Sequence, residues 1–421
     1  MIEEPAGGAG AAASVLLAED DSSLRTLLSF ELKRLGLQAV SVSSGEQALA
    51  SMRSRSFDLV VTDLRMGRVD GFAVLEACRR HMPEAQVIVI TGHGTIDSAV
   101  RAMKAGAFDY LTKPVEPEVL GICVQKALER KRLLTEVEQL RAQVRGKFSF
   151  ENIIYASPSF DRVLDLARKV AATDAAVLVQ GESGTGKELV ARAIHSSSAR
   201  RNHPFVAVNC GALPEGLLES ELFGHARGSF TGAIANKRGL FEEAHDGTLF
   251  LDEISEMSTN LQVKLLRALQ QGEVRRVGEN RSIKVNARII AAANKDLKAA
   301  MKAGTFRDDL YYRLNVFPIV VPPLRSRRED ILPLAEFFLK KARQKHGAAA
   351  SGSPKALRFS PEAAKALLRY AWPGNVRELE HAVERAVILS SGPEIRADDL
   401  PPESRAAGRA LARPRARGGR R

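Results

Sequence analysis

Short apolar runs alternate with stretches of helical periodicity along most of the chain. Five such runs fall between residues 14 and 114, and they read SVLLAED, LQAVSV, FDLVVTD, QVIVIT and FDYLTKP. The stretches between them, such as SSLRTLLSFELKRLG, repeat apolar residues every three or four positions. Strands that alternate with helices predict a parallel sheet covered by helices on both faces. In such a sheet the functional residues gather at the carboxyl ends of the strands.

A second alternating block runs from residue 151 to about residue 324. Its strand-like runs are AAVLVQG, FVAVNC, GTLFLDE and ARIIAAAN. From residue 325 to about residue 389 the pattern is helical only, as in EDILPLAEFFLKKARQKHG and NVRELEHAVERAVILSS. The chain is therefore expected to hold two α/β domains, the second with a small helical subdomain, or lid.

One continuous helical pattern joins the two blocks over residues 117 to 144. Leu133, Val137, Leu140 and Val144 recur in it at 4-3-4 spacing. This spacing is typical of a short coiled coil, but a solvated linker helix with one apolar stripe explains it equally well.

The composition excludes several classes of protein. No apolar run approaches the roughly 18 residues that a membrane-spanning helix needs. The start, MIEEPAGGAGAAAS, lacks the basic and apolar regions of a signal peptide. Three cysteines with no CxxC or Cys/His spacing argue against a disulfide framework and against a zinc site. We therefore expect a cytoplasmic protein without membrane contact.

The net charge of +12 suggests a polyanionic partner, but a short tail holds much of it. Seven arginines and one acid between residues 401 and 421 account for +6. This Arg-, Ala-, Gly- and Pro-rich segment predicts disorder, and Pro401, Pro402 and Pro414 would interrupt a helix. Flexible guanidinium groups suit phosphates but cannot read bases, so any DNA contact is expected to be non-specific. A tail that only improves solubility is the alternative.

Acidic residues follow the strand-like runs of the first block. Glu19 and Asp20 come after the first strand, and Asp63 ends the third. Carboxylates at neighbouring strand ends can hold Mg²⁺, which prefers oxygen ligands. Thr91 and Lys113, at the ends of the fourth and fifth strands, supply a hydroxyl and an ammonium that can neutralise a phosphoryl group. Single acids there would ordinarily cap helices or face solvent, but the combination predicts a phosphate acceptor at Asp63.

With these residues, segment 14–125 resembles a response-regulator receiver domain, which has a flavodoxin-like, doubly wound sheet. The resemblance implies that a histidine kinase phosphorylates Asp63. It implies a set of Mg²⁺ ligands: Glu19, Asp20, Asp63 and the backbone carbonyl of Arg65. It also implies the residues that respond to phosphate, with Thr91 and Tyr110 as switch residues and Lys113 as the ion partner. Gly67 stands where such domains often have proline, and a glycine loosens that loop.

The run GESGTGKE lies between the strand-like VLVQ and the helical ELVARAIH. Glycines let backbone N–H groups wrap phosphates, and a helix N-terminus favours the anion. Lys187 is expected to reach the β- and γ-phosphates, whereas Glu188 replaces the hydroxyl residue that usually touches Mg²⁺. The strand–loop–helix context favours a nucleotide site whose residues are Gly181, Glu182, Ser183, Gly184, Thr185, Gly186, Lys187 and Glu188.

The run GTLFLDE places two acids at the end of an apolar strand downstream of this loop. Asp252 suits Mg²⁺ coordination and Glu253 suits activation of the attacking water. A strand that ends in a helix cap would explain one acid but not the pair. The second domain is therefore predicted to hydrolyse a nucleoside triphosphate.

Residues 152 to about 390 closely resemble the AAA+ domain of NtrC-like, sigma-54-dependent transcription activators, a P-loop α/β domain with a helical lid. GESGTGKE is that family's own phosphate loop, and the resemblance implies ATP. ELFGHARGSFTGA carries the loop by which the family contacts sigma-54, here made of Gly228, Ser229, Phe230, Thr231, Gly232 and Ala233. Phe230 and Thr231 are implied to make the contact, and Ser229 stands where the family usually has alanine.

Further positions match the family one by one. Asn209 resembles the residue that holds the water-activating glutamate until ATP binds, Asn294 resembles the first nucleotide sensor, and Arg377 resembles the second. Arg307 and Arg313, in FRDDLYYRLNVFPI, resemble arginine fingers that enter a neighbouring subunit's site. Surface arginines on a charged helix are the alternative for these two.

The expected domains are a disordered start (1–13), a receiver domain (14–125), a linker helix (126–150), an AAA+ α/β subdomain (151–324), a lid (325–396) and a basic disordered tail (397–421). The expected protein is a two-component response regulator. Phosphorylation would control ring assembly and ATP hydrolysis, which would remodel the sigma-54 RNA polymerase holoenzyme to the open complex. The resemblance alone implies a hexamer when active and a dimer at rest.

Two alternatives differ in the partner or in the chemistry. One is an AAA+ remodeller of another protein, against which the GSFTGA loop argues. The other is a non-hydrolysing adaptor, against which the intact Lys187, Asp252 and Glu253 argue. The Fis-type helix-turn-helix that usually ends the family is not expected in the 21 residues after Leu400.

Overall fold

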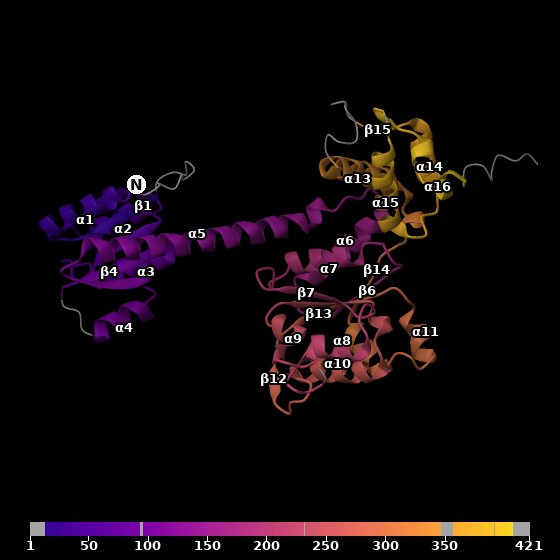
Figure 1. Ribbon diagram of the computed structural model, residues 1–421, viewed down its shortest axis with the longest axis horizontal. Coiled ribbons are helices and arrows are strands. Elements are labelled where there is room, and N and C mark those ends of the chain that lie inside the picture. The colour runs from indigo at the N-terminus through magenta and orange to yellow at the C-terminus, as the bar shows by residue number, and fades with distance from the viewer. Residues whose placement is uncertain (1–12, 93–95, 231, 347–356, 391, 407–421) are drawn as a thin grey trace, which may run out of the picture. The chain divides into compact units, whose positions relative to one another are not determined.

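The computed structural model describes the whole chain except residues 1–12, 93–95, 231, 347–356, 391 and 407–421. The chain divides into two compact units, Met1–Gln143 and Val144–Arg421. Figure 1 shows helices and strands alternating along the first unit and along most of the second. Among the described residues, no helix has the length and apolar character needed to cross a bilayer.

The first unit is a five-stranded parallel sheet in the order β2-β1-β3-β4-β5. This is the doubly wound order expected for a flavodoxin-like fold. Its strands are β1 (Ser14–Ala18), β2 (Gln38–Val42), β3 (Leu59–Asp63), β4 (Gln86–Thr91) and β5 (Asp109–Thr112). Its helices are α1 (Ser22–Arg34), α2 (Gly45–Ser54), α3 (Gly71–His81), α4 (Ile96–Lys104) and α5 (Pro117–Lys147).

Both faces of this sheet are buried. Leu28 and Leu32 of α1 pack with Leu120 and Val124 of α5 against one face. Side chains of α2 and α3, such as Leu75, cover the other. Because both faces are covered, β3 and β4 are buried along their whole length and read as continuous apolar runs.

Helix α5 continues past the first unit's core without a break. The helix predicted over residues 117 to 144 is present and runs to Lys147. Beyond the buried Ala127, Lys131 forms an ion pair with Asp58, and the Arg130 guanidinium lies 5.7 Å from the Phe108 ring centroid. The start of the linker segment is thus tied to the first unit.

The apolar stripe of α5 is exposed where its side chains are described. Leu133 and Val137 expose 55% and 43% of their surface. The side chains of Leu140 and Val144 lie outside the described part of the chain. The exposure of Leu133 and Val137 is consistent with both the coiled coil and the solvated linker helix.

The second unit begins with an α/β subdomain whose parallel sheet has the order β14-β6-β13-β10-β7. Its strands are β6 (Val177–Gln180), β7 (Phe205–Asn209), β10 (Thr248–Asp252), β13 (Arg288–Ala293) and β14 (Phe317–Val320). The first four match the four strand-like runs. The edge strand β14 was missed because it contains Pro318, which lacks the N–H of a central strand.

Helices cover both faces of this second sheet, as Figure 1 shows. One face carries α6 (Pro158–Ala171) and α7 (Lys187–Ser196). The other carries α8 (Glu215–Phe223), α9 (Leu240–Glu243), α10 (Thr259–Gln271), α11 (Leu297–Lys302) and α12 (Asp308–Leu314). Two short antiparallel pairs project between these helices: β8 (Gly224–His225) with β9 (Lys237–Arg238), and β11 (Glu273–Arg275) with β12 (Ser282–Lys284).

The lid that follows is mainly helical. It contains α13 (Ile331–His346), α14 (Pro361–Arg369) and α15 (Asn375–Leu389), which pack around the buried Trp372. The helical pattern did not predict a pair of two-residue strands in the lid. Strand β15 (Arg358–Phe359), before α14, pairs with β16 (Glu394–Ile395), after α15. Strands of two residues are too short to produce a periodicity.

The prediction of disorder over residues 397–421 was wrong for residues 397–406. A 3₁₀ turn (Ala397–Asp399) and helix α16 (Pro402–Ala406) form there. Leu400 is buried in the lid core, and Ser404 is buried beside it. Pro402 occupies the first position of α16, where its missing N–H breaks no helical hydrogen bond. Residues 407–421 lie outside the described part of the chain.

Candidate functional site

The first site lies at the carboxyl ends of the first unit's strands. Glu19 and Asp20 follow β1 and Asp63 ends β3, and one oxygen of each lies within 4.8 Å of the others. The Lys113 ammonium, after β5, lies 2.7 Å from Glu19 Oε1 and 2.6 Å from Asp63 Oδ2. Parallel strands β1, β3, β4 and β5 therefore bring together residues that are up to 94 positions apart.

Charge at this site is concentrated and only partly compensated. Burial raises the pKa of the Glu19 carboxyl. Burial also opposes the charge of Lys113, but its hydrogen bonds to Asp63 and Glu19 raise the pKa of its ammonium overall. Glu19 Oε2 is buried without a hydrogen-bond partner among the described residues. An orphaned carboxylate oxygen beside two further acids fits a hard divalent cation such as Mg²⁺.

The remaining residues implied for this site surround Asp63. Thr91 is buried at the end of β4, and its carbonyl accepts the N–H of Lys113 at 2.8 Å. Tyr110 is half-buried on β5. The Arg65 N–H donates to Asp63 Oδ1 at 3.1 Å, so the turn after β3 is held against the acid.

The second site is the loop between β6 and α7. Gly181, Gly184 and Gly186 take φ values of +155°, +75° and +99°, which explains the three glycines. The Lys187 ammonium lies inside the curve of the loop and donates to the carbonyls of Gly181 and Glu182 at 2.8 and 2.9 Å. Burial lowers the pKa of Lys187. This loop can cradle phosphates at the N-terminus of α7.

The other residues of the loop bond within the loop, along α7 or to the lid. Thr185 is buried and donates its hydroxyl to the Glu182 carbonyl at 2.8 Å. Glu188, on the first turn of α7, pairs with Arg192. Ser183 offers its carbonyl to the lid residue Asn375 at 3.0 Å. Arg377, also in the lid, has its Cβ 3.2 Å from the place where a Gly184 Cβ would lie.

Two acids end β10 next to this loop. Burial raises the pKa of Asp252, and the Asp252 carboxylate accepts the Glu253 N–H at 2.9 Å. Glu253 takes a left-handed φ of +53°, a conformation that is strained for residues other than glycine and is often found at functional sites. Asn294, after β13, donates its amide to Glu253 Oε1 at 3.4 Å. Asn209 lies opposite Asp252 on β7, and its amide oxygen accepts the Gly211 N–H at 2.8 Å.

Arg307 and Arg313 lie on the surface around α12. Arg307 forms an ion pair with Asp309, and Arg313 donates to the Leu269 carbonyl at 2.9 Å. Among the described contacts, neither arginine touches the nucleotide loop of its own chain. Both side chains are exposed.

The candidate sigma-54 loop, residues 228–233, projects after β8. Gly228 and Gly232 take positive φ values of +79° and +109°. Phe230 is 40% exposed, and its ring packs edge-on against His225 with centroids 5.0 Å apart. Ala233 is buried, and Thr231 lies outside the described residues. The base of the loop is therefore held, while Phe230 remains accessible.

The hairpin β11–β12 supports this loop. Val277 donates to the Gly224 carbonyl at 2.9 Å and accepts the Ala226 N–H at 3.0 Å. Gly278, at φ +80°, lies so close to Ser229 that a Cβ there would come within 2.6 Å of the Ser229 Cβ. The Ser229 hydroxyl oxygen is buried in this contact and has no hydrogen-bond partner among the described residues.

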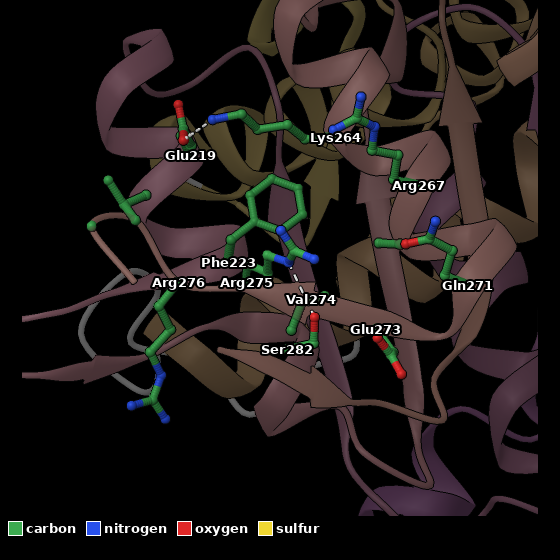
Figure 2. A pocket seen from close by; sticks show the side chains of 13 residues that line it. Glu219, Phe223, Lys264, Arg267, Gln271, Glu273, Val274, Arg275, Arg276 and Ser282 are labelled. Atoms are coloured by element: carbon green, nitrogen blue, oxygen red, sulfur yellow. Dashed lines mark hydrogen bonds and ion pairs between the residues drawn. The ribbon is translucent and has the colours of Figure 1, made fainter. Parts of the chain in front are cut away.

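A pocket of about 380 Å³ lies between α8, α10 and this hairpin. Figure 2 shows Glu219 joined to Lys264 across one wall and Arg275 joined to Ser282 on the hairpin. Arg276, on the same hairpin, forms a two-pronged ion pair with the buried Glu242 of α9, at 2.9 and 2.7 Å.

The Glu242–Arg276 pair joins the two hairpins, because Glu242 also accepts the Gly239 N–H that follows β9. Neither residue was predicted from the sequence. Glu242 lies in the run LFEEA, and only the apolar residues beside it indicate that this segment is buried.

Three family models together match most of the chain. Residues 15–125 match the response regulator receiver domain, residues 153–320 the sigma-54 interaction domain, and residues 325–416 the AAA+ ATPase lid domain. The lid match includes the buried Leu400 and α16.

Two transcriptional regulators and one solved structure are similar to most of the chain. The transcriptional regulatory protein ZraR of Klebsiella oxytoca is 46% identical over 393 residues, which cover 93% of this chain and 86% of ZraR. The regulatory protein AtoC of Escherichia coli K12 is 44% identical over 391 residues, 93% of this chain and 84% of AtoC. The crystal structure of NtrX from Brucella abortus with ATP is 36% identical with a TM-score of 0.64, covering 96% of this chain and 87% of NtrX.

Proposed function

The chain belongs to the NtrC-like family of sigma-54-dependent response regulators, and from that premise we propose which residues carry each step. It is an AAA+ ATPase that activates transcription by sigma-54 RNA polymerase under the control of a receiver domain. The observation that carries the proposal is the joint presence of a phosphate loop, two acids and a projecting Phe230 loop on one α/β subdomain.

Control begins at Asp63, which takes a phosphoryl group from a histidine kinase. Lys113, already 2.6 Å from Asp63 Oδ2, is placed to pair with a phosphoryl oxygen. Glu19, Asp20, Asp63 and the Arg65 carbonyl would hold Mg²⁺, which would neutralise the incoming phosphate. Thr91 on β4 and Tyr110 on β5 would change their side-chain positions when Asp63 is phosphorylated.

Hydrolysis takes place at the second site. Lys187 and the loop N–H groups bind the phosphates of ATP, and Asp252 would hold Mg²⁺. Glu253 orients the attacking water. Asn209 and Asn294 lie on the strands on either side of β10: Asn209 would hold Glu253 until ATP binds, and Asn294 would sense the bound nucleotide. Arg377 approaches the loop from the lid.

Arg307 and Arg313 are proposed to complete the site of a neighbouring subunit. Their exposure supports this, as does the lack of any contact with their own loop among the described residues. The active assembly would then be a ring, by family resemblance a hexamer formed from dimers.

Separation-of-function variants test the proposal. Phe230→Ala should keep ATP hydrolysis and lose open-complex formation by sigma-54 polymerase, because the exposed ring contacts the partner and not the nucleotide. Glu253→Gln should bind ATP and lose both activities. If Phe230→Ala abolishes hydrolysis as fully as Glu253→Gln, the loop is structural and the assignment fails. If the parent hydrolyses ATP but neither binds sigma-54 nor supports open-complex formation, the target is another protein.

A further inference from the structure

The lid touches every residue of the nucleotide loop from 182 to 185. Each contact comes from one of two lid segments, the turn at residues 324–327 and the start of α15. The contacts are Glu182 with Arg325 and Asn375, the Ser183 carbonyl with Asn375, the Gly184 carbonyl with the Val376 N–H, and the Thr185 carbonyl with Arg327. The lid is thus bonded directly to the loop that cradles phosphates.

One part of this interface is buried and densely bonded. Arg327 is 2% exposed, donates to the Thr185 carbonyl at 2.8 Å, and lies 4.4 Å over the Phe160 ring. Asp330 is fully buried, 3.5 Å from Arg327, and accepts the N–H groups of Ala156 and Ser157 at 2.6 Å. Arg327 and Asp330 both belong to the lid, and their bonds to Thr185, Ala156 and Ser157 cross to the α/β subdomain. These buried bonds resist opening, because breaking them would leave a charge without its partners away from water.

The other part is accessible to water. Arg325 makes two bonds to the Glu182 carboxylate, at 2.7 and 2.5 Å, and the two side chains are 44% and 42% exposed. The paired guanidinium lowers the pKa of Glu182 to about 2, so the carboxylate is charged at neutral pH. Exposed pairs are weak and can break and reform readily.

Asn375 links the two segments. Its amide nitrogen donates to Glu182 Oε2 at 3.2 Å, and its amide oxygen accepts the Leu324 N–H at 2.8 Å. It is fully buried at φ +54°, two residues before Arg377. Asn375 therefore couples the position of Glu182 to the start of α15, the helix that carries Arg377.

We infer that Glu182 and Arg325 form a latch that positions the lid, and with it Arg377, over the bound nucleotide. Closing the latch holds the nucleotide. Opening it lets ADP leave, while the buried contacts of Arg327 and Asp330 with the α/β subdomain stay in place as the pivot. Glu182 and Arg325 are positioning residues, because they act through the lid. The inference rests on the proposed roles of the phosphate loop and Arg377.

The test compares Glu182→Gln, Arg325→Gln and the double variant in the full-length chain. Lys341→Gln is the matched control, because it breaks a similarly exposed ion pair with Glu380 inside the lid, away from the loop. KM for ATP, kcat and the dissociation rate of a fluorescent ADP analogue are measured, with thermal midpoints to verify folding.

Each single variant should raise KM and the ADP dissociation rate about two- to five-fold, the range of an exposed ion pair, with a smaller change in kcat. The double variant should be no worse than either single one, and Lys341→Gln should match the parent. Unchanged ADP dissociation in both single variants, or additive effects in the double variant, would overturn the latch. A parent protein that fails to bind ATP would instead refute the proposed function.

Discussion

Ser229→Ala is expected to stabilise the protein, although it lies in a functional loop. The buried Ser229 hydroxyl oxygen has no partner among the described residues, and an unsatisfied buried polar group costs about 1–3 kcal/mol. Alanine removes that oxygen and keeps the Cβ that packs against Gly278. Allowing for lost packing, we expect a gain of about 1 kcal/mol, equal to about 2 °C in the unfolding midpoint of a unit this large.

Differential scanning calorimetry of the full-length chain measures the midpoint of the ATPase unit. Ser220→Ala is the matched control, because it also removes a buried serine hydroxyl, but one that bonds His225 Nδ1 at 2.7 Å. The control should lower the midpoint by a similar amount, since it strands the imidazole nitrogen. If Ser229→Ala lowers the midpoint as Ser220→Ala does, the hydroxyl has a partner and the reasoning is refuted.

Three further outcomes are expected. His195 is buried against Thr248, and burial lowers its pKa from 6.5 to about 4. The unfolded chain therefore takes up a proton at a higher pH than the folded one, and the free energy of unfolding falls by about 3 kcal/mol as pH drops from 6.5 toward 4. His195→Gln should flatten this pH dependence of the ATPase unit's unfolding midpoint. Arg313→Ala should lower ATP turnover by roughly 10³-fold or more and abolish its rise with protein concentration, whereas undiminished turnover would contradict a shared site. Acetyl phosphate with Mg²⁺ should add a phosphoryl mass to the parent and to Asp58→Asn but not to Asp63→Asn.

Local motifs were readable because their residues are neighbours along the chain. The phosphate loop needs a strand, three glycines and a helix start within ten residues, and each has its own signal in GESGTGKE. The acids at the ends of β1, β3 and β10 could be assigned to strand ends in the same way, because the apolar run of each strand shows where that strand ends.

Elements without a local signal were missed or misjudged. Pro318 interrupts the strand-like pattern of the edge strand β14, so this strand was not predicted. The two-residue strands β15 and β16 are too short to show a periodicity. The Arg-rich composition around Leu400 predicted disorder, yet Leu400 is buried against the lid. A prediction of disorder from composition averages over many residues, whereas the burial of Leu400 depends on one side chain and the space it fills in the lid.

The sequence by itself therefore determined the two α/β domains and the family, and it predicted the acid cluster around Asp63 and the nucleotide loop. Only the tertiary structure decided which distant charges meet. Glu182 and Arg325 are 143 positions apart, and Glu242 and Arg276 are 34 apart, with no motif to connect either pair. Ion pairs of this kind depend on how helices and hairpins pack, and packing depends on the whole chain at once.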